Sequence, residues 1–374
     1  YKIYEIAGMK MKKILVFGMT ENPGGIESVI MNYYRKIDRK KIQFDFLSNS
    51  PYIAYGDEIK SLGGKIYLIT ARKKNYFKFK QELKAFMSQH AIEYEAIWVN
   101  VCMLSNIDYL ISAKKYGIPK RIIHCHNSSN DGGIVKYYIH QYNKKRLSKY
   151  ATHFWSCSEE ASPWFFDDKV IQSPNYKVIV NAIDVKKYMR NNVIREQYRE
   201  DLKVQEKIVI GHVGRFHFQK NHQLLIRIFK CLAVQNKKYH LLLVGQGELE
   251  QEIKDIVDKE NLNQRVTFLG ARNDVDKIYQ AMDLFMLPSK FEGLGIVALE
   301  AQAALLPCLL SDGVPEIVKV NDNVKFVSLN DSPEHWANVA EKMLKEPQTI
   351  NKIITSEYNI DMQVKKFERE LSGK

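Results

Sequence analysis

The chain has 374 residues and a formal net charge of +13, and 45% of its residues are hydrophobic. A chain of this length exceeds what one hydrophobic core normally holds, so two domains are expected. No run approaches the ~20 apolar residues that span a bilayer, the first residues show no apolar signal-peptide core, and the five scattered cysteines form no Cys-x-x-Cys pair. These features argue against a membrane span, a disulfide framework and a zinc site, and they predict a cytoplasmic protein with reduced thiols.

Positive charge is concentrated in the first half of the chain. Residues 1–190 hold 31 Lys and Arg against 17 Asp and Glu, whereas the remaining residues hold 25 against 26. Basic clusters lie at 72–84 (with Tyr76, Phe77 and Phe79 interleaved), 114–121 and 144–149. Such clusters have three alternative explanations. They form solvated faces, they attract the protein to an anionic membrane surface at roughly 1 kcal/mol per basic residue, or they bind nucleic acid.

Strand-like and helix-like segments alternate through the first half. Short β-branched or alternating apolar runs predict strands at 13–17, 43–47, 66–69, 96–100, 121–125, 152–156 and 177–180. Helical periodicity predicts helices near 26–36, 79–89 and 107–116. This alternation is typical of a parallel sheet with helices on both faces. Residues 1–8 precede the first methionine, so they are either the tail of a longer start or foreign to the natural protein.

The second half repeats the scheme after a polar stretch at 186–206, which is predicted to be a linker. Strands are predicted at 207–213, 240–244, 265–268, 284–287, 308–310 and 324–327, with helices at 223–235, 249–259, 275–281 and 336–344. The chain is therefore expected to be α/β, with two Rossmann-type domains in tandem. Ligands of such sheets bind at the carboxyl ends of the strands, so two facing sheets suggest an interdomain cleft.

Two glutamates, Glu292 and Glu300, enclose the glycine pair Gly293 and Gly295 before an apolar run that predicts a helix to about residue 306. The free N–H groups of such a helix start suit a phosphate. Because eight residues exceed two helical turns, Glu292 is expected in the preceding loop and Glu300 well inside the helix. Glu300 is predicted either to face solvent or to hold a hydroxyl-bearing ligand, because unpaired burial of a carboxylate is costly.

A basic loop follows the strand at 207–213. It carries Gly214, Arg215 and Lys220 and precedes a helix. Two fixed cations beside a helix start suit a diphosphate, because arginine offers a bidentate fork and lysine a point charge. The alternative is a solvent-exposed turn.

Glycine turns after other strands give weaker signals. Leu269 and Gly270 end one strand and either offer backbone groups to a base or form a simple turn. Gly24 and Gly25 follow the first strand, where paired glycines let the backbone approach a ligand, although a flexible turn is the alternative. The full Gly-x-Gly-x-x-Gly spacing is absent, which counts against a NAD site.

Two histidines, His124 and His126, end the strand at 121–125 on one side of it. A metal pair is the alternative to a polar site residue, but no acidic or cysteine partner stands at ligand spacing. His126 is predicted to face a cleft and to be functional. The turn at 181–184 is expected to fix the domain entry, and the turn at 313–316 either closes the phosphate side or is a plain turn.

In this order the segments resemble a retaining glycosyltransferase of the GT-B fold, family four (glycosyltransferase group 1), from about Lys12 onward. The most specific motif is Glu-x7-Glu, met by Glu292 and Glu300, and the next is Gly-Arg-x4-Lys, met by Gly214, Arg215 and Lys220. The resemblance implies an acceptor-binding domain at 9–185, joined by the segment 357–374 that crosses back to it, and a nucleotide-sugar donor domain at 186–356. It implies no metal and no other cofactor.

The resemblance also implies roles for the matching residues. Arg215 and Lys220 would neutralise the donor diphosphate, Glu300 would bind the ribose and Glu292 the sugar. The donor-binding set is Gly214, Arg215, Lys220, Leu269, Gly270, Glu292, Gly293, Leu294, Gly295 and Glu300. The acceptor side is Gly24, Gly25 and His126. The catalytic set is His126, Arg215, Lys220 and Glu292.

The Gly-Gly-Ile-Glu and His-x-His-Asn segments resemble those of members that build bacterial exopolysaccharide or capsule. The resemblance implies hexosyl or N-acetylhexosaminyl transfer from a UDP-sugar to a glycan or polyprenyl-linked acceptor. It also implies a cytoplasmic enzyme, peripheral on the inner membrane face, with no nucleic-acid partner. Two departures occur: Asn221 and His222 stand where a glycine and a small residue are frequent, and Ala182 replaces a common glycine.

There are four rival functions. A nucleotide-sugar epimerase of the same fold would need no acceptor, and a phosphorylase would use orthophosphate. A basic nucleic-acid-binding protein would bind DNA or RNA and not UDP, but the usual recognition motifs are missing. A NAD-dependent dehydrogenase is disfavoured by the absent fingerprint.

Overall fold

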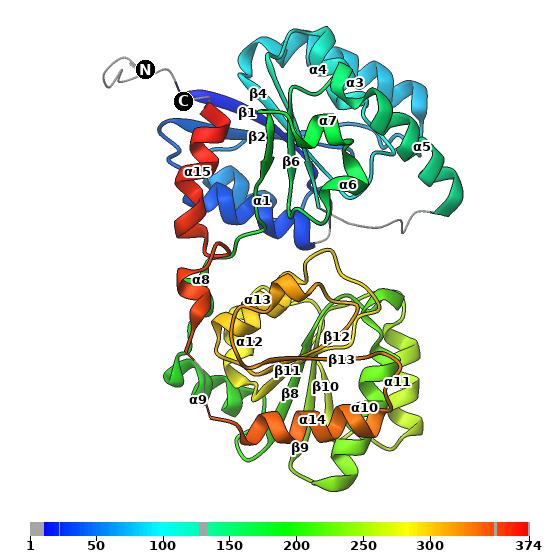
Figure 1. Ribbon diagram of the computed structural model, residues 1–374, viewed down its shortest axis with the longest axis vertical. Coiled ribbons are helices and arrows are strands. Elements are labelled where there is room, and N and C mark those ends of the chain that lie inside the picture. The colour runs from blue at the N-terminus through cyan, green and yellow to red at the C-terminus, as the bar shows by residue number, and fades with distance from the viewer. Residues whose placement is uncertain (1–10, 22, 127–132, 348–349, 373–374) are drawn as a thin grey trace. The chain divides into compact units, whose positions relative to one another are not determined.

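The computed structural model describes residues 11–21, 23–126, 133–347 and 350–372 (Figure 1). The chain forms two compact units, one made of the residues up to Ala182 together with those from Ile360 onward, the other of Ile183–Asn359. The sequence places these boundaries at 185/186 and 356/357. Each unit is a parallel β-sheet with helices on both faces, which confirms the predicted α/β class.

The sheet of the first unit has the strand order β3-β2-β1-β4-β5-β6-β7. Its strands are β1 (Lys12–Phe17), β2 (Ile42–Ser48), β3 (Ile66–Leu68), β4 (Ala96–Val101), β5 (Lys120–Cys125), β6 (His153–Ser156) and β7 (Tyr176–Val178). The chain leaves β1 in one direction and returns to β4 on its other side. This reversal opens a crevice at the carboxyl ends of β1 and β4, which is where such sheets bind ligands.

The helices of the first unit include one from the far end of the chain. They are α1 (Gly25–Lys36), α2 (Gly56–Ser61), α3 (Tyr76–His90), α4 (Asp108–Lys115), α5 (Gly133–Arg146), α6 (Ser162–Phe165), α7 (Asp168–Ile171) and α15 (Ile360–Ser372). Helix α15 lies beside α1 (Figure 1). Its Phe367 is buried and stacks on Tyr33 with ring centroids 4.1 Å apart, and it also meets Trp98 at 5.1 Å. The last helix therefore completes the core of the first unit.

The second unit repeats this plan with the strand order β10-β9-β8-β11-β12-β13. Its strands are β8 (Ile208–Val213), β9 (Tyr239–Val244), β10 (Val266–Phe268), β11 (Leu284–Leu287), β12 (Cys308–Ser311) and β13 (Val324–Val327). Its helices are α8 (Val185–Tyr188), α9 (Asn192–Asp201), α10 (His222–Gln235), α11 (Glu250–Lys259), α12 (Val275–Ala281), α13 (Ile296–Ala303) and α14 (Pro333–Lys345). The reversal here lies between β8 and β11.

Several helix starts follow local signals in the sequence. The side chain of Asn75 accepts the N–H of Lys78 at 3.0 Å, and Ser332 accepts the N–H of His335 at 3.2 Å. These N-cap bonds satisfy amides that the first turn leaves without a partner. No described helix is both long and apolar enough to cross a bilayer.

The prediction that residues 186–206 form a linker is wrong. They contain α8 and α9, and α9 packs against α12 within the second unit. The guanidinium of Arg199 lies 3.1 Å from a carboxylate oxygen of Asp283, and Arg195 pairs with the same aspartate. The polar composition of this segment therefore belongs to a helix, α9, that ion pairs hold against the rest of the second unit. The apolar helix after Glu292 also ends earlier than predicted, at Ala303, because Leu305 takes a left-handed conformation.

Replacement of Phe367 by alanine should destabilise the first unit by about 3–5 kcal/mol, because a buried aromatic ring is lost from the core. Met362→Ala is the matched control, since Met362 lies on the same helix with 61% of its surface exposed. Urea unfolding followed by tryptophan fluorescence measures both variants. Equal, small losses would contradict the packing of α15 in this core.

Candidate active site

Three loops meet at the carboxyl edge of the second sheet, where the strand order reverses. They follow β8, β11 and β12, which are neighbours in the sheet. The N–H of Lys290 donates to the carbonyl of Gln219 at 2.7 Å, and the side-chain amide of Gln219 donates to the carbonyl of Phe291 at 3.0 Å. The N–H of Glu292 donates to the carbonyl of Gly313 at 2.9 Å. The β8 loop and the β11 loop are thus bonded to each other, and the β12 turn closes one side of the β11 loop.

An ion pair between Lys220 and Glu292 connects the first two loops. The Lys220 ammonium lies 2.6 Å from Oε1 of Glu292, and both side chains are largely buried. Ser289 donates its hydroxyl to the same oxygen at 2.6 Å, and Gln219 approaches Oε2 at 3.3 Å. A buried carboxylate needs such partners because desolvation penalises its charge. The predicted residues Lys220 and Glu292 therefore lie in direct contact.

Arg215 stands beside this pair in the chain but is held differently. Its guanidinium pairs with Glu248 at 3.0 Å, and 64% of the Arg215 side chain is exposed. The neighbouring Gly214 packs closely on the stem of Lys220, because a Cβ on this glycine would lie 3.1 Å from Lys220 Cδ. The loop therefore carries one cation fixed by buried contacts and one on the surface.

Glycines allow the loops after β8 and β9 to touch. A Cβ on Gly245 would lie 2.0 Å from the carbonyl oxygen of Gly214, and Gly245 has a φ of +139°. Gly270, which follows β10, accepts the N–H of Gly245 at 2.8 Å through its carbonyl, and the N–H of Leu269 donates to the carbonyl of Leu243 at 2.9 Å. Leu269 and Gly270 therefore lie next to the loop that carries Gly214.

The start of α13 follows Gly293, Leu294 and Gly295. Gly295 caps the helix with a φ of +81°, a conformation that glycine adopts without strain. Leu294 is buried beneath the turn. The glycine cap thus sets the first turn of α13 immediately after the loop that holds Glu292.

Glu300 lies on α13 with both carboxylate oxygens occupied. The hydroxyl of Tyr188 donates to Oε1 at 2.9 Å, and that of Tyr279 lies 3.0 Å from Oε2. Burial raises the pKa of Glu300 above its ordinary value of 4.5, whereas the two tyrosine bonds lower it. The sequence suggested only solvent or a ligand as partners, and neither tyrosine carried a signal that linked it to Glu300.

His126 lies at the carboxyl end of β5 in the first unit and is buried. Its Nε2 lies 2.9 Å from Oδ1 of Asn100, and its Nδ1 lies 3.1 Å from Oδ1 of Asn181. Burial lowers the pKa of His126 to about 4, so the imidazole is neutral near pH 7. Its neighbour His124 is engaged by the indole N–H of Trp98 at 3.3 Å and the carbonyl of Ile179 at 3.1 Å. The indole N–H of Trp98 and the carbonyl of Ile179 thus engage both nitrogens of His124, whereas a neutral His126 has one N–H and can donate to only one of the two amide oxygens.

The turn at 181–184 was expected only to fix the domain entry, yet Asn181 orients His126. Asn100 was not singled out at all, although its place at the end of β4 beside β5 makes it a neighbour of His126 once the strand order is known. The companion residue Asn127 of the His-x-His-Asn segment lies outside the described residues, as does Asn22.

Gly24 and Gly25 begin α1, and a buried carboxylate holds the loop before them. Glu27 accepts the N–H of Gly24 at 3.1 Å and the N–H of Thr20 at 3.0 Å. A glutamate that bonds back to the start of its own helix stabilises that start. The glutamate of the Gly-Gly-Ile-Glu segment is therefore structural, and it sets the position of the two glycines.

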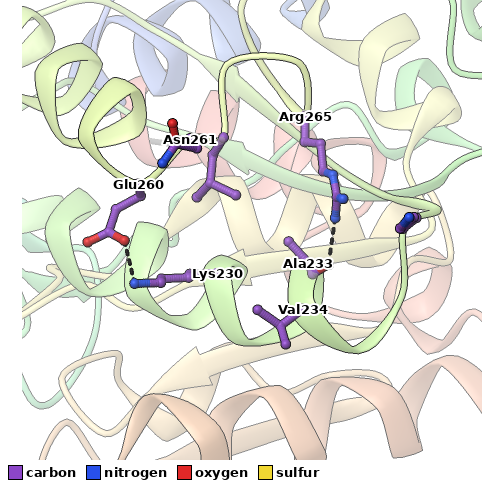
Figure 2. A pocket seen from close by; sticks show the side chains of 8 residues that line it. Lys230, Ala233, Val234, Glu260, Asn261 and Arg265 are labelled. Atoms are coloured by element: carbon purple, nitrogen blue, oxygen red, sulfur yellow. Dashed lines mark hydrogen bonds and ion pairs between the residues drawn. The ribbon is translucent and has the colours of Figure 1, made fainter.

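A separate cavity of about 280 Å³ lies at the opposite edge of the second sheet (Figure 2). It is lined by Lys230, Ala233, Glu260 and Arg265 among others, and Lys230 pairs with Glu260 across it. Arg265 immediately precedes β10, so this cavity is at the amino ends of the strands. It is remote in the sheet from the loops that carry Lys220 and Glu292.

Comparison with known proteins gives a family and a fold. The sequence profile of glycosyl transferases group 1 matches residues 194–359. The putative glycosyltransferase EpsF of Bacillus subtilis is 30% identical over 334 residues, which cover 87% of this chain and 86% of EpsF. The UDP-Gal:alpha-D-GlcNAc-diphosphoundecaprenol alpha-1,3-galactosyltransferase of Escherichia coli is 33% identical over 162 residues, 41% of either chain. The crystal structure of Anabaena Alr3699/HepE with UDP and glucose has a TM-score of 0.78 at 18% identity, covering 97% of this chain and 100% of that one.

Gly245→Ala should destabilise the second unit more than Gly270→Ala does. The added methyl group meets the Gly214 carbonyl at position 245, whereas position 270 has nothing within 4 Å and carries only the left-handed backbone cost of about 1–2 kcal/mol. Urea unfolding of both variants measures the difference. A smaller loss for Gly245→Ala would show that the two loops are not in close contact.

Glu300 should make the stability of the second unit fall as pH rises. A folded-state pKa above the unfolded value means that the folded protein binds more protons, so stability declines from about pH 4.5 up through the raised pKa. Wild type should therefore lose free energy of unfolding relative to Glu300→Gln across that window. Glu316→Gln is the control, because Glu316 is exposed. If the free energy of unfolding of wild type rose with pH relative to that of Glu300→Gln, the raised pKa of Glu300 would be refuted.

Proposed function

Since the chain belongs to the group 1 glycosyltransferases, we propose that it transfers a hexosyl or N-acetylhexosaminyl group from a UDP-sugar to a glycan or polyprenyl-linked acceptor in cell-surface polysaccharide biosynthesis. Its two parallel-sheet units have the GT-B fold. The observation that carries the proposal is the Lys220–Glu292 pair beside the glycine-capped start of α13, at the reversal point of the second sheet.

The diphosphate of the donor is assigned to Lys220, Arg215 and the first turn of α13. An ammonium has three donors, so Lys220 can keep Glu292 and still reach a phosphate oxygen. Arg215 forms an exposed ion pair with Glu248, and such surface pairs are worth about 0–1 kcal/mol. A diphosphate can therefore recruit Arg215 at little cost, while Lys220 is already in place.

Glu292 and Glu300 are assigned to the hydroxyl groups of the donor, the first to the sugar and the second to the ribose. Among the described residues, Oε2 of Glu292 has only the long contact with Gln219, so lone pairs remain for a sugar hydroxyl. Glu300 has both oxygens on tyrosines, and a ribose would have to share or replace those donors. Leu269 and Gly270, beside the β9 loop, are assigned to the base.

The proposed reaction retains the anomeric configuration and needs no enzymic nucleophile. The nucleoside diphosphate leaves through an oxocarbenium-like state, its charge held by the two cations and the helix start. The leaving phosphate then helps to take the proton of the acceptor hydroxyl, which attacks from the same face. Fixed donors aimed at a developing charge are a large contribution to such catalysis. No metal ion is part of the proposal.

The acceptor side is assigned to the first unit, with Gly24, Gly25 and His126. The neutral imidazole of His126 is a hydrogen-bonding group there, and one of its amide partners must give way for it to reach a substrate. The galactosyltransferase relative, whose name gives UDP-Gal as donor and a diphosphoundecaprenol-linked acceptor, supports the choice of donor and acceptor classes. The basic first half, with the chain's excess of positive charge, supports a peripheral position on an anionic inner membrane face.

Loss of either cation should reduce transfer ~10²–10³-fold, the usual effect of removing one charge-stabilising group. Arg215→Ala tests the exposed cation. Lys220→Met removes the ammonium but leaves Glu292 buried without a counter-charge, so Lys220→Met/Glu292→Gln is made as well to separate misfolding from lost chemistry. Sugar transfer from UDP-glucose, UDP-galactose and their N-acetyl forms to a membrane-lipid extract is the assay, and UDP-induced thermal stabilisation is the binding readout.

Lys230→Met is the matched control, because Lys230 lies at the opposite edge of the same sheet (Figure 2). It should retain wild-type transfer and UDP stabilisation. Near wild-type transfer by the Arg215 and Lys220 variants would sink the diphosphate assignment. Conversion of the donor into an epimeric sugar without any acceptor, or sugar transfer to orthophosphate alone, would point instead to an epimerase or a phosphorylase.

A further inference from the structure

A second cavity, of about 620 Å³, opens at the carboxyl edge of the sheet in the first unit. Its walls come from the segments after β1, β2, β3 and β4 and from α5. The lining residues with charge are Glu21, Arg72, Lys73 and Lys136. Known small-molecule sites have volumes of about 300–1,000 Å³. The cavity also adjoins the loop between β1 and α1, because Glu21 belongs to that loop.

Positive charge exceeds negative charge around this cavity. Arg72 lies 3.3 Å from Asp108, and the same aspartate also serves Lys80 at 3.2 Å. Lys73 and Lys136 are exposed, and within the described part of the chain no carboxylate is paired with either. The cavity lining therefore has three cations and one carboxylate, Glu21, which favours an anionic ligand.

Arg72 is the fixed member of the cationic group. Its Nη1 donates to the carbonyl of Ser105 at 3.4 Å, and its guanidinium lies 5.5 Å from the ring centre of Tyr76. These contacts hold the planar fork at the cavity wall, between the segments that follow β3 and β4. A held guanidinium is suited to the oxygens of a phosphate.

An apolar stripe on α5 begins at the rim of the cavity. The stripe consists of Ile134, Val135, Tyr138, Ile139 and Tyr142, all exposed. Ile139 and Lys136 of the same helix line the cavity, and Phe77 on α3, next to the lining residue Tyr76, is 84% exposed. Apolar side chains gathered in this way on a surface mark a binding site for apolar material.

We infer that this cavity binds the phosphate groups of a lipid-linked sugar acceptor, whose hydrocarbon chain lies along the apolar stripe. A neutral glycan would make no use of the cations, and a free phosphate ester would make no use of the stripe. The ligand required by both features is an amphiphile with an anionic head. Its identity as the acceptor rests on the proposed function, whereas its chemical class rests on the cavity and the stripe.

Isothermal titration with farnesyl diphosphate tests the inference on the full chain. Lys73→Gln/Lys136→Gln should weaken binding at least tenfold. Lys74→Gln/Lys145→Gln is the matched control, since it removes the same charge from neighbouring exposed positions that do not line the cavity, and it should bind within twofold of wild type. Inorganic pyrophosphate should bind more weakly than farnesyl diphosphate, with the same dependence on the cavity pair.

Val135→Ser/Tyr138→Ser tests the stripe. It should reduce farnesyl diphosphate binding to the level of pyrophosphate and leave pyrophosphate binding unchanged. Equal losses in both lysine pairs would overturn the inference in favour of diffuse surface charge. Farnesyl diphosphate no tighter than pyrophosphate would indicate a site for free phosphate esters and would also overturn it.

Two further readouts separate this site from its neighbours. If phosphatidylglycerol vesicles bind through the cavity lysines while farnesyl diphosphate does not bind, the cavity is a binding site for bilayer headgroups and the inference fails. UDP stabilisation should be the same in wild type and all three double variants. A chain that binds UDP but not farnesyl diphosphate sinks this inference alone, whereas one that binds farnesyl diphosphate but not UDP sinks the proposed function alone.

Discussion

The buried ion pair between Lys220 and Glu292 is the contact on which the site of the second unit depends. It joins a loop after β8 to a loop after β11, which are 72 residues apart in the chain and neighbours only because the strand order reverses between them. A buried pair is costly to break, because either partner alone would be an uncompensated charge. The pair therefore fixes the spacing of the two loops before any ligand arrives, and the contact between Gly214 and Gly245 holds the loop after β9 against the loop after β8.

In the first unit, neutral side chains rather than an ion pair connect the carboxyl ends of neighbouring strands. Asn100 donates to the carbonyl of Phe17 at 3.2 Å and contacts His126, which in turn contacts Asn181. The ends of β1, β4 and β5 are thereby linked through side-chain amides and an imidazole that burial keeps uncharged. A site assigned to a sugar hydroxyl can use such groups, whereas a site assigned to a diphosphate needs cations.

Cations in the two units differ in how firmly they are held. Lys220 and Arg72 are bound by carboxylates and backbone or aromatic groups, while Arg215, Lys73 and Lys136 are exposed. A fixed cation lowers the reorganisation needed on binding, and an exposed one can move to a ligand at small cost. Each assigned anion site thus combines one cation held by protein contacts with at least one exposed cation.

The sequence by itself determined the strands, helices such as α1, α3 and α10, and the parallel α/β class, because the period of apolar residues and the glycines at strand ends are local properties. It did not predict α5 or α9. The sequence also singled out Lys220 and Glu292 through their motifs. The structure explains why Asn221 can stand where glycine is frequent, because its φ is 55° and asparagine tolerates this left-handed conformation. The tertiary structure alone decided the partners: Tyr188 and Tyr279 on Glu300, Glu248 on Arg215, Asn100 and Asn181 on His126, and the folding of residues 186–206 into the second unit. These are contacts between segments that the tertiary fold brings together, and no spacing along the chain encodes which distant side chain will lie opposite a given one.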